Sequence, residues 1–298
     1  MPLSNPTLED LRREIDRIDD AIHDLLIRRA QTVERIATLK TGSGGFLRPA
    51  REAAILRRLI ARHTGPFPKP ALVRIWREMI SGLTRMQGPF AVAVYAPEDR
   101  RGHWDIARDH FGGFTPMAAV NSPLAAIRAV TEGGATVGIV PFPSEDDVDP
   151  WWRLLAADDG RPLPRVVARL PFGGRGNARG DAGDALAIAC VAYEPTGDDR
   201  SLIRLELSED LSRSRLKDAL AAVGLAPIGF YSWQDPASGP GLTLLIEVAD
   251  YVTVGDRRLP ALYKRLGETL RRIATLGGYA VPLDLGPGLR QEAHHELR

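Results

Sequence analysis

A basic residue interrupts the apolar stripe of the first long helical segment. Arg29 takes a position on the continuation of that stripe, where a leucine would be expected. A guanidinium on such a face needs an anionic partner, either a buried carboxylate or a ligand. Lys40 follows eleven residues later, which on one helix places it about 20° around and roughly 16 Å along from Arg29. Two long cationic side chains on one face can hold a small anionic ligand between them.

Four further polar residues are candidates for the same ligand site. Arg12 lies 17 residues before Arg29, roughly 25 Å away along a straight helix, so only an antiparallel second copy would bring it to that ligand. Arg51 and Glu52 stand in the first turn of a second helix, and Gln87 ends the apolar stripe of a third. Taken singly, Arg51, Glu52 and Gln87 each have an ordinary explanation as well. An acid such as Glu52 is favoured in the first turn of a helix, and Arg51 and Gln87 can face solvent.

Apolar periodicity places these residues on three helices. The glycine-rich segment 41–45 ends a long first helix over residues 5–40, Pro49 begins a second that runs to about His63, and Pro70 begins a third. The first helix carries apolar residues in alternating steps of three and four, a seam formed by Leu8, Leu11, Ile15, Ile18, Ile22, Leu25, Ile36 and Leu39. We predict an all-helical unit over residues 1–88.

The pattern changes after residue 88 to short apolar runs that alternate with helical segments. The runs AVAVY, MAAV, TVGIVPF and RVVARL, with helices near 103–111, 124–131 and 151–156, indicate an α/β lobe with a parallel sheet. Residues 173–184 are rich in glycine and are typical of a flexible linker. Their glycines do not follow the spacing of a dinucleotide-binding loop.

A second mixed unit is predicted after the glycine-rich segment. After a first strand, its elements are expected in the βαββαβ order of the split ferredoxin-like arrangement, with strands at 185–193, 202–207, 227–233, 242–248 and 279–283 and helices at 211–223 and 259–274. The expected fold class is multidomain α, α/β and α+β. Its divisions are a helical domain, a single α/β lobe, a linker, a βαββαβ domain and a tail, at 1–88, 89–172, 173–184, 185–286 and 287–298.

Composition disfavours several classes of protein. The 298 residues are 44% hydrophobic and 26% charged, which is typical of a globular protein. Cys190 is the single cysteine and the six histidines are scattered, so we expect no disulfide and no metal. The sequence has no apolar run long enough for a membrane span and no signal-peptide pattern at its start, which favours a cytoplasmic location.

Charge is distributed unevenly along the chain. Residues 1–88 carry 16 Lys and Arg against 10 Asp and Glu, whereas the remainder carries 23 against 28. The basic part lacks the aromatic residues that interleave with cations in single-stranded nucleic-acid binders. We therefore do not expect a nucleic acid partner, and solvated helix faces or a small acidic ligand remain as explanations.

Three segments resemble a known family. LRREIDRIDDAIHDLLIRRAQTVERIATLK, FLRPAREAAILRRL and MISGLTRMQ resemble the all-helical chorismate mutases over residues 6–88, most closely the mutase domain that is fused to prephenate dehydratase. The resemblance implies an intertwined helical homodimer that needs no cofactor. The family's polar site positions match Arg12, Arg29, Lys40, Arg51, Glu52 and Gln87. Arg48 and Leu83 depart from the family pattern, because some members carry aspartate and serine there.

The resemblance also implies the chemistry. A chorismate dianion rearranges to prephenate in one intramolecular step that requires neither nucleophile nor metal. The arginines would bind the two substrate carboxylates, with Arg12 donated by the second copy, and select the reactive conformer. Lys40 and Gln87 would donate to the ether oxygen as negative charge develops there, and Glu52 would accept from the ring hydroxyl. Because Gln87 is neutral, this activity is not expected to require acid pH.

The remaining chain resembles the other parts of such bifunctional enzymes, with altered motifs. VAVYAPE and VGIVPF resemble one lobe of a prephenate dehydratase, but residues 96–102 stand where the family has Gly-Pro-Glu-Gly-Thr-Phe-Ser, so we expect that dehydratase activity is lost. Residues 201–282 resemble an ACT regulatory domain, which leaves an aromatic amino-acid effector open. The alternatives are a bifunctional mutase and dehydratase, or a non-catalytic sensor of an aromatic-pathway dianion.

Overall fold

The computed structural model describes residues 6–39, 46–156, 163–180, 183–208, 211–234 and 241–285. Lys40 lies outside the described residues, as do residues 181–182 of the glycine-rich segment and the predicted tail 287–298.

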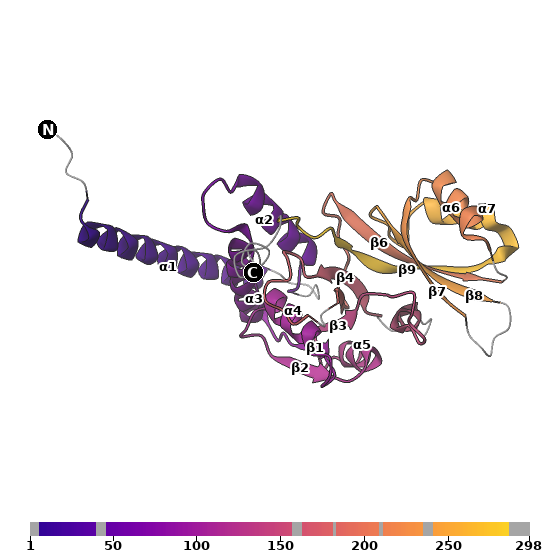
Figure 1. The fold of residues 1–298 in the computed structure, drawn as a ribbon, viewed down its shortest axis with the longest axis horizontal. Coiled ribbons are helices and arrows are strands. Elements are labelled where there is room, and N and C mark those ends of the chain that lie inside the picture. Colours follow the sequence, from indigo (N-terminus) through magenta and orange to yellow (C-terminus); the bar gives the residue numbers. More distant parts are fainter. Residues whose placement is uncertain are drawn as a thin grey trace, which may run out of the picture.

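The first part of the chain is helical, as predicted. Its helices are α1 (Leu8–Leu39), α2 (Pro49–Arg62) and α3 (Lys69–Gln87), and α2 and α3 each have proline in their first turn. Helix α1 projects away from the rest of the molecule and approaches α3 only near its C-terminal end (Figure 1). The predicted apolar seam is therefore exposed in the single chain, with its eight side chains between 44% and 79% accessible.

The strands form one continuous sheet of nine strands in the order β2-β1-β3-β5-β4-β9-β6-β8-β7. Their bounds are β1 (Val92–Tyr95), β2 (Met117–Val120), β3 (Val137–Pro141), β4 (Arg165–Leu170), β5 (Ala185–Ala189), β6 (Asp199–Leu207), β7 (Pro227–Trp233), β8 (Leu242–Val248) and β9 (Leu270–Ala280). The α/β lobe and the βαββαβ unit thus share a sheet.

The α/β lobe is only partly parallel. Strand β1 pairs in parallel with β2 and β3, and α4 (Gly102–Phe111) and α5 (Pro123–Thr131) pack against these strands. Strands β4 and β5 pair antiparallel with each other, and β5 pairs antiparallel with β3. The predicted helix at Trp151–Ala156 is a 3-10 helix.

The glycine-rich segment has a different role from the predicted linker. Residues 173–184 connect β4 to β5, which are neighbours in the sheet, so β5 belongs to the α/β lobe rather than to the next domain. The physical reason is burial, because the apolar run ALAIA of β5 is covered along its whole length between β3 and β4. Asp184, just before β5, accepts hydrogen bonds from Arg169 and Arg175 and ties the connection to the lobe.

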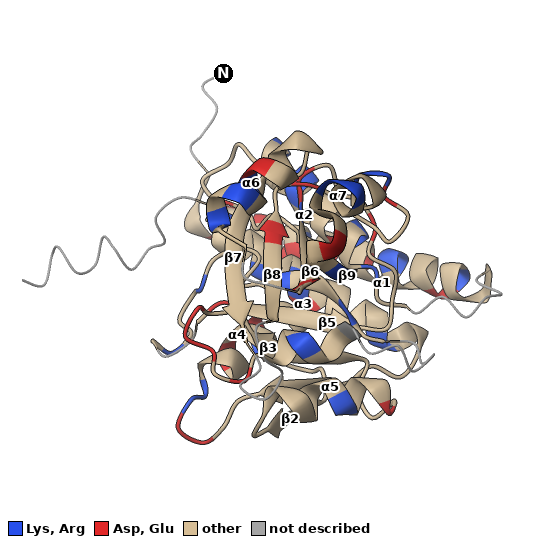
Figure 2. Ribbon diagram, turned by 90° about the vertical axis from the view of Figure 1, so that its right-hand side faces the viewer, with Lys and Arg blue, Asp and Glu red and all other residues tan. Residues whose placement is uncertain are grey.

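The last part of the chain has the predicted βαββαβ order. Strands β9, β6, β8 and β7 pair antiparallel, and α6 (Arg213–Ala222) and α7 (Arg258–Leu266) lie together beside them (Figure 2). The helix predicted over 259–274 ends early, and the strand predicted at 279–283 is the end of the longer β9. Gly267 adopts a φ of 58° and ends α7, and the chain then extends to pair with β6.

One ladder contact and a partly buried polar cluster join the two mixed units. Strand β4 meets β9 in parallel at Val166 and Gly277. Close to this junction, Arg169 forms an ion pair with Asp184 at 2.6 Å and donates to the Tyr279 hydroxyl at 3.2 Å. The Tyr279 hydroxyl donates in turn to Glu247 of β8. These contacts bind the lobe to the βαββαβ unit, whereas the two were predicted to be separate domains.

Candidate functional site

Helix α2, which carries Arg51 and Glu52, is fastened to the rest of the chain just before its start and near its middle. Arg48, just before the helix, donates to both carboxylate oxygens of Glu194 at 2.9 and 3.0 Å. Further along, Arg57 donates to Thr196 at 2.7 Å and to the carbonyl oxygens of Asp198 and Val281 at 2.7 and 3.0 Å. The segment before β6 and the end of β9 therefore hold α2 in place.

Glu52 forms a buried ion pair with a residue of α3. The Nη1 of Arg77 donates to the Glu52 Oε2 at 2.8 Å, and the two residues are 4% and 9% exposed, respectively. Burial raises the pKa of the Glu52 carboxyl, whereas the charge and the hydrogen bond of Arg77 oppose that rise. Because an unpaired buried carboxylate is costly, Arg77 is what allows Glu52 to be ionised at this position.

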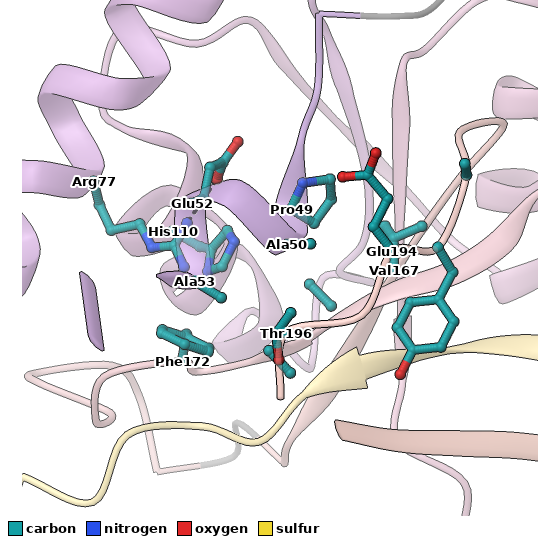
Figure 3. A pocket seen from close by; sticks show the side chains of 14 residues that line it. Pro49, Ala50, Glu52, Ala53, Arg77, His110, Val167, Phe172, Glu194 and Thr196 are labelled. Carbon is teal, nitrogen blue, oxygen red and sulfur yellow. Dashed lines mark hydrogen bonds and ion pairs between the residues drawn. The ribbon is translucent and has the colours of Figure 1, made fainter. Parts of the chain in front are cut away.

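Residues of the α/β lobe complete the surroundings of this pair. The Arg77 guanidinium lies over the Phe172 ring, 5.1 Å from its centroid, and His110 of α4 is buried beside it (Figure 3). The cavity between α2, α3, α4 and β4 has a volume of about 20 Å³. A cavity of that size holds about one water molecule and is far too small for a chorismate-sized ligand.

His110 makes folding stability depend on pH. Burial, together with the charge of Arg77, holds its pKa well below the ordinary value of 6.5. Below that pH the unfolded chain binds a proton that the folded chain rejects, so the free energy of unfolding should fall on acidification. Going from about pH 7.5 to about pH 5.5 should cost about 1 kcal/mol through this residue.

Urea unfolding of the wild type and of His110→Asn at both pH values would measure this contribution. The variant should lose the pH dependence that His110 supplies, whereas His23→Asn, on the exposed face of α1, should retain it. An unchanged difference between the two pH values in His110→Asn would contradict the prediction.

The other predicted site residues are dispersed in the single chain. Arg29 is half-buried on α1, its Nη1 is buried without a hydrogen-bond partner among the described residues, and desolvation lowers its pKa. Arg12 is exposed near the start of α1, 4.0 Å from Glu9. Arg51 is exposed, and Gln87 donates to the Leu83 carbonyl at 3.2 Å.

No hydrogen bond or ion pair joins Arg12, Arg29, Arg51, Glu52 and Gln87 to one another in the part of the chain that the structure describes. Of the two departures from the family pattern, Arg48 is paired with Glu194, and Leu83 is packed in the interior. Next to it, the Thr84 hydroxyl donates to the Ile80 carbonyl at 3.0 Å.

Arg77 is the residue that sequence reasoning missed. A signal was present, because Arg77 lies four residues after Val73 and three before Ile80, on the apolar face of α3. All three side chains are buried. A cation on such a face requires a partner, which is the same argument that singled out Arg29 on α1.

The described residues contain no group of three or more His, Cys, Asp or Glu that could hold a metal ion. Over the same residues, no helix has the length and hydropathy needed to cross a bilayer.

Comparison with known proteins identifies the helical part. The family chorismate mutase type II matches residues 11–88. Bifunctional chorismate mutase/prephenate dehydratases of Stutzerimonas stutzeri and Neisseria gonorrhoeae are 33% identical over 144 residues and 36% identical over 109 residues. These matches cover 45% and 37% of this chain but only 38% and 26% of the relatives, so the chain spans well under half the length of the curated relatives it matches.

Among solved structures, the prephenate dehydratase of Arthrobacter aurescens in complex with L-Phe is 13% identical to this chain, with a TM-score of 0.46. The match covers 70% of this chain and 98% of the dehydratase chain. That similarity is too low to establish a shared fold. The family match covers the helices that carry Arg29, Glu52 and Gln87, and the match to the Stutzerimonas stutzeri relative, over 144 residues, is longer than this helical part. Residues 11–88 of this chain are therefore a chorismate mutase type II domain.

Proposed function

We propose that this chain is a chorismate mutase, which isomerises chorismate to prephenate in aromatic amino-acid biosynthesis by a Claisen rearrangement. One observation carries the proposal: within the matched residues 11–88, all six polar side-chain types expected at the family's site are retained. Arg29 adds physical support. Its buried Nη1 has no hydrogen-bond partner among the residues that the structure describes, and a substrate carboxylate would supply one.

In the proposed mechanism, cations bind the substrate dianion and follow the movement of charge. Arg29 and Arg51 would hold carboxylates and favour the compact conformer in which the reacting carbon atoms meet. Lys40 and Gln87 would donate to the ether oxygen while its bond to carbon breaks, which lowers the energy of the transition state more than that of bound substrate. Glu52 would accept from the ring hydroxyl.

The proposal includes a homodimer formed through α1. The apolar seam of this helix has no partner in the single chain and is between 44% and 79% exposed along about 48 Å of helix. An antiparallel second α1 would cover the seam and bring the partner's Arg12 towards Arg29.

A two-product assay separates the functional alternatives. Purified protein would be incubated with chorismate, and the loss of chorismate and the formation of prephenate and phenylpyruvate would be followed by chromatography. We expect prephenate without phenylpyruvate. Phenylpyruvate would support the bifunctional alternative, which the names of the relatives favour. Saturable binding of chorismate without turnover would instead support a sensor and refute the mutase proposal.

We also propose that the βαββαβ unit is an ACT-like regulatory domain that binds an aromatic amino acid. The support is its element order together with the sequence resemblance over residues 201–282. A cytoplasmic location stays a prediction of the sequence.

Phenylalanine at millimolar concentration should therefore raise Tm by about 2 °C or more, because a ligand that binds only the folded chain stabilises it by mass action. Scanning calorimetry with L-phenylalanine, with D-phenylalanine as the matched control, measures this shift. Equal Tm values in both and in buffer alone would exclude such an effector.

A further inference from the structure

We propose that Arg77 is a positioning residue of the mutase site, acting through Glu52, and that Phe172 of the α/β lobe holds Arg77 in place. The lobe would then be a structural part of the mutase site rather than an unconnected remnant. This inference rests on the proposed function, because it assigns a role to the partner of a proposed substrate-binding carboxylate.

The geometry of the ion pair leaves Glu52 able to act. Arg77 reaches from α3 to α2 and engages Oε2 at 2.8 Å, and the backbone of Arg48 supplies a further hydrogen bond to the carboxyl. Because the two carboxylate oxygens together offer about four acceptor sites, Glu52 can still accept from a further donor. Helix α2 is itself clamped by Arg48 and Arg57. With the backbone held and the carboxylate bonded from α3 and from Arg48, its orientation is restricted, which is the requirement for accepting a hydrogen bond from a substrate hydroxyl.

Arg77 is held between the two parts of the chain. Its guanidinium lies between the Glu52 carboxylate on one side and the Phe172 ring, 5.1 Å away, on the other. Phe172 follows β4 and belongs to the same buried cluster as Ala53, Leu56 and Val73 of the helices. A cation that stacks on an aromatic ring and donates to a carboxylate loses both contacts if the lobe moves away.

The surrounding titratable groups are few. Helix α4 contributes His110, which burial and Arg77 keep neutral at working pH. The segment after β5 contributes Tyr193, whose pKa is raised by burial, and Glu194, which is paired with Arg48. The residues of β4 and β9 that line the cavity have no titratable side chains; they are Val167, Ala168 and Ala280. Loss of the Arg77 cation would therefore act on the pKa of Glu52 and also on that of His110, so the test has to follow the Glu52 carboxyl by its own signal.

The test compares the pH dependence of kcat/KM for wild type, Arg77→Gln, Arg77→Lys and Arg74→Gln. Removing the cation raises the pKa of Glu52 further, so the acid limb of Arg77→Gln should move to higher pH by about one unit or more. Arg77→Lys keeps a cation beside Glu52, so its acid limb should lie close to that of the wild type. Arg74→Gln is the matched control, because Arg74 lies one turn earlier on α3 and pairs with Asp109 instead. The acid limb of kcat/KM in Arg74→Gln should stay at the wild-type pH.

A second readout keeps the test independent of turnover and of folding. The Glu52 carboxyl would be titrated by carbon-13 NMR, with Glu52→Gln used to assign its signal, and Phe172→Leu would be included in case Arg77→Gln does not fold. Phe172→Leu should shift the titration in the same direction by a smaller amount. A wild type that does not convert chorismate refutes the proposed function. An active wild type with unshifted limbs and titrations in the folded variants overturns the role of Arg77.

Discussion

Replacing Lys40 with alanine is expected to lower kcat for chorismate at least about a hundredfold, while the fold is kept. The reason is that negative charge develops on the ether oxygen only as its bond to carbon breaks, so a cation placed there stabilises the transition state more than bound substrate. Lys40 directly follows the end of α1 at Leu39, eleven residues after Arg29. Steady-state kinetics and circular dichroism would measure activity and folding in the same samples.

Lys69→Ala is the matched control for this substitution. It removes a lysine from the exposed first position of α3, outside the proposed site, and should leave kcat within a factor of about two, because exposed surface substitutions are usually small in effect. Near-normal turnover by Lys40→Ala would remove Lys40 from the mechanism. A loss confined to KM would assign it to uniform binding of substrate rather than to the chemical step.

Two inactive variants should restore activity when they share a dimer. Arg12→Ala and Arg51→Ala should each lower kcat/KM by about tenfold or more, since a charge-assisted hydrogen bond to a charged group contributes about 1.5–3 kcal/mol. In a symmetric dimer with Arg12 donated across chains, a mixed dimer combines both substitutions in one site and leaves the other site intact. Random pairing therefore yields about a quarter of wild-type activity.

Both variants are suited to the experiment because both side chains are exposed in the single chain. Co-expression with two affinity tags would isolate the mixed dimers, whose activity should be about half that of wild type. Arg13→Ala, which alters the neighbouring exposed arginine paired with Glu9 and Asp10, should stay active alone and in every mixture. Mixed dimers as inactive as their parents would show that Arg12 does not act across chains.

The helical part could be predicted closely because its signals are local. Prolines mark the starts of α2 and α3, and a sustained three-four apolar period marks α1. The same period predicted the seam, which is exposed in the single chain. These features depend on residues within one or two helical turns of each other, so they can be read without knowing what lies elsewhere in the chain.

The errors arose where distant segments compete for the same neighbours. A glycine-rich stretch is the same in sequence whether it links two domains or two strands of one sheet. Residues 173–184 join strands because β5 has buried edges to pair with on both sides. Likewise, residues 270–274 could continue α7 by their composition, but Gly267 ends the helix and β6 provides a ladder for β9.

The sequence alone predicted the three helices of residues 1–88 and the order of the later elements along the chain, because apolar periodicity and helix-starting residues carry that information. The six polar site residues were assigned by the family resemblance. The tertiary structure decided that Glu52 is paired with Arg77 and that the Arg77 guanidinium lies over the Phe172 ring, since burial and charge partners depend on which surfaces meet. It also left the seam of α1 without a cover in the single chain. The free energy gained when two distant segments bury their surfaces against each other depends on both segments, so neither segment's sequence predicts it alone.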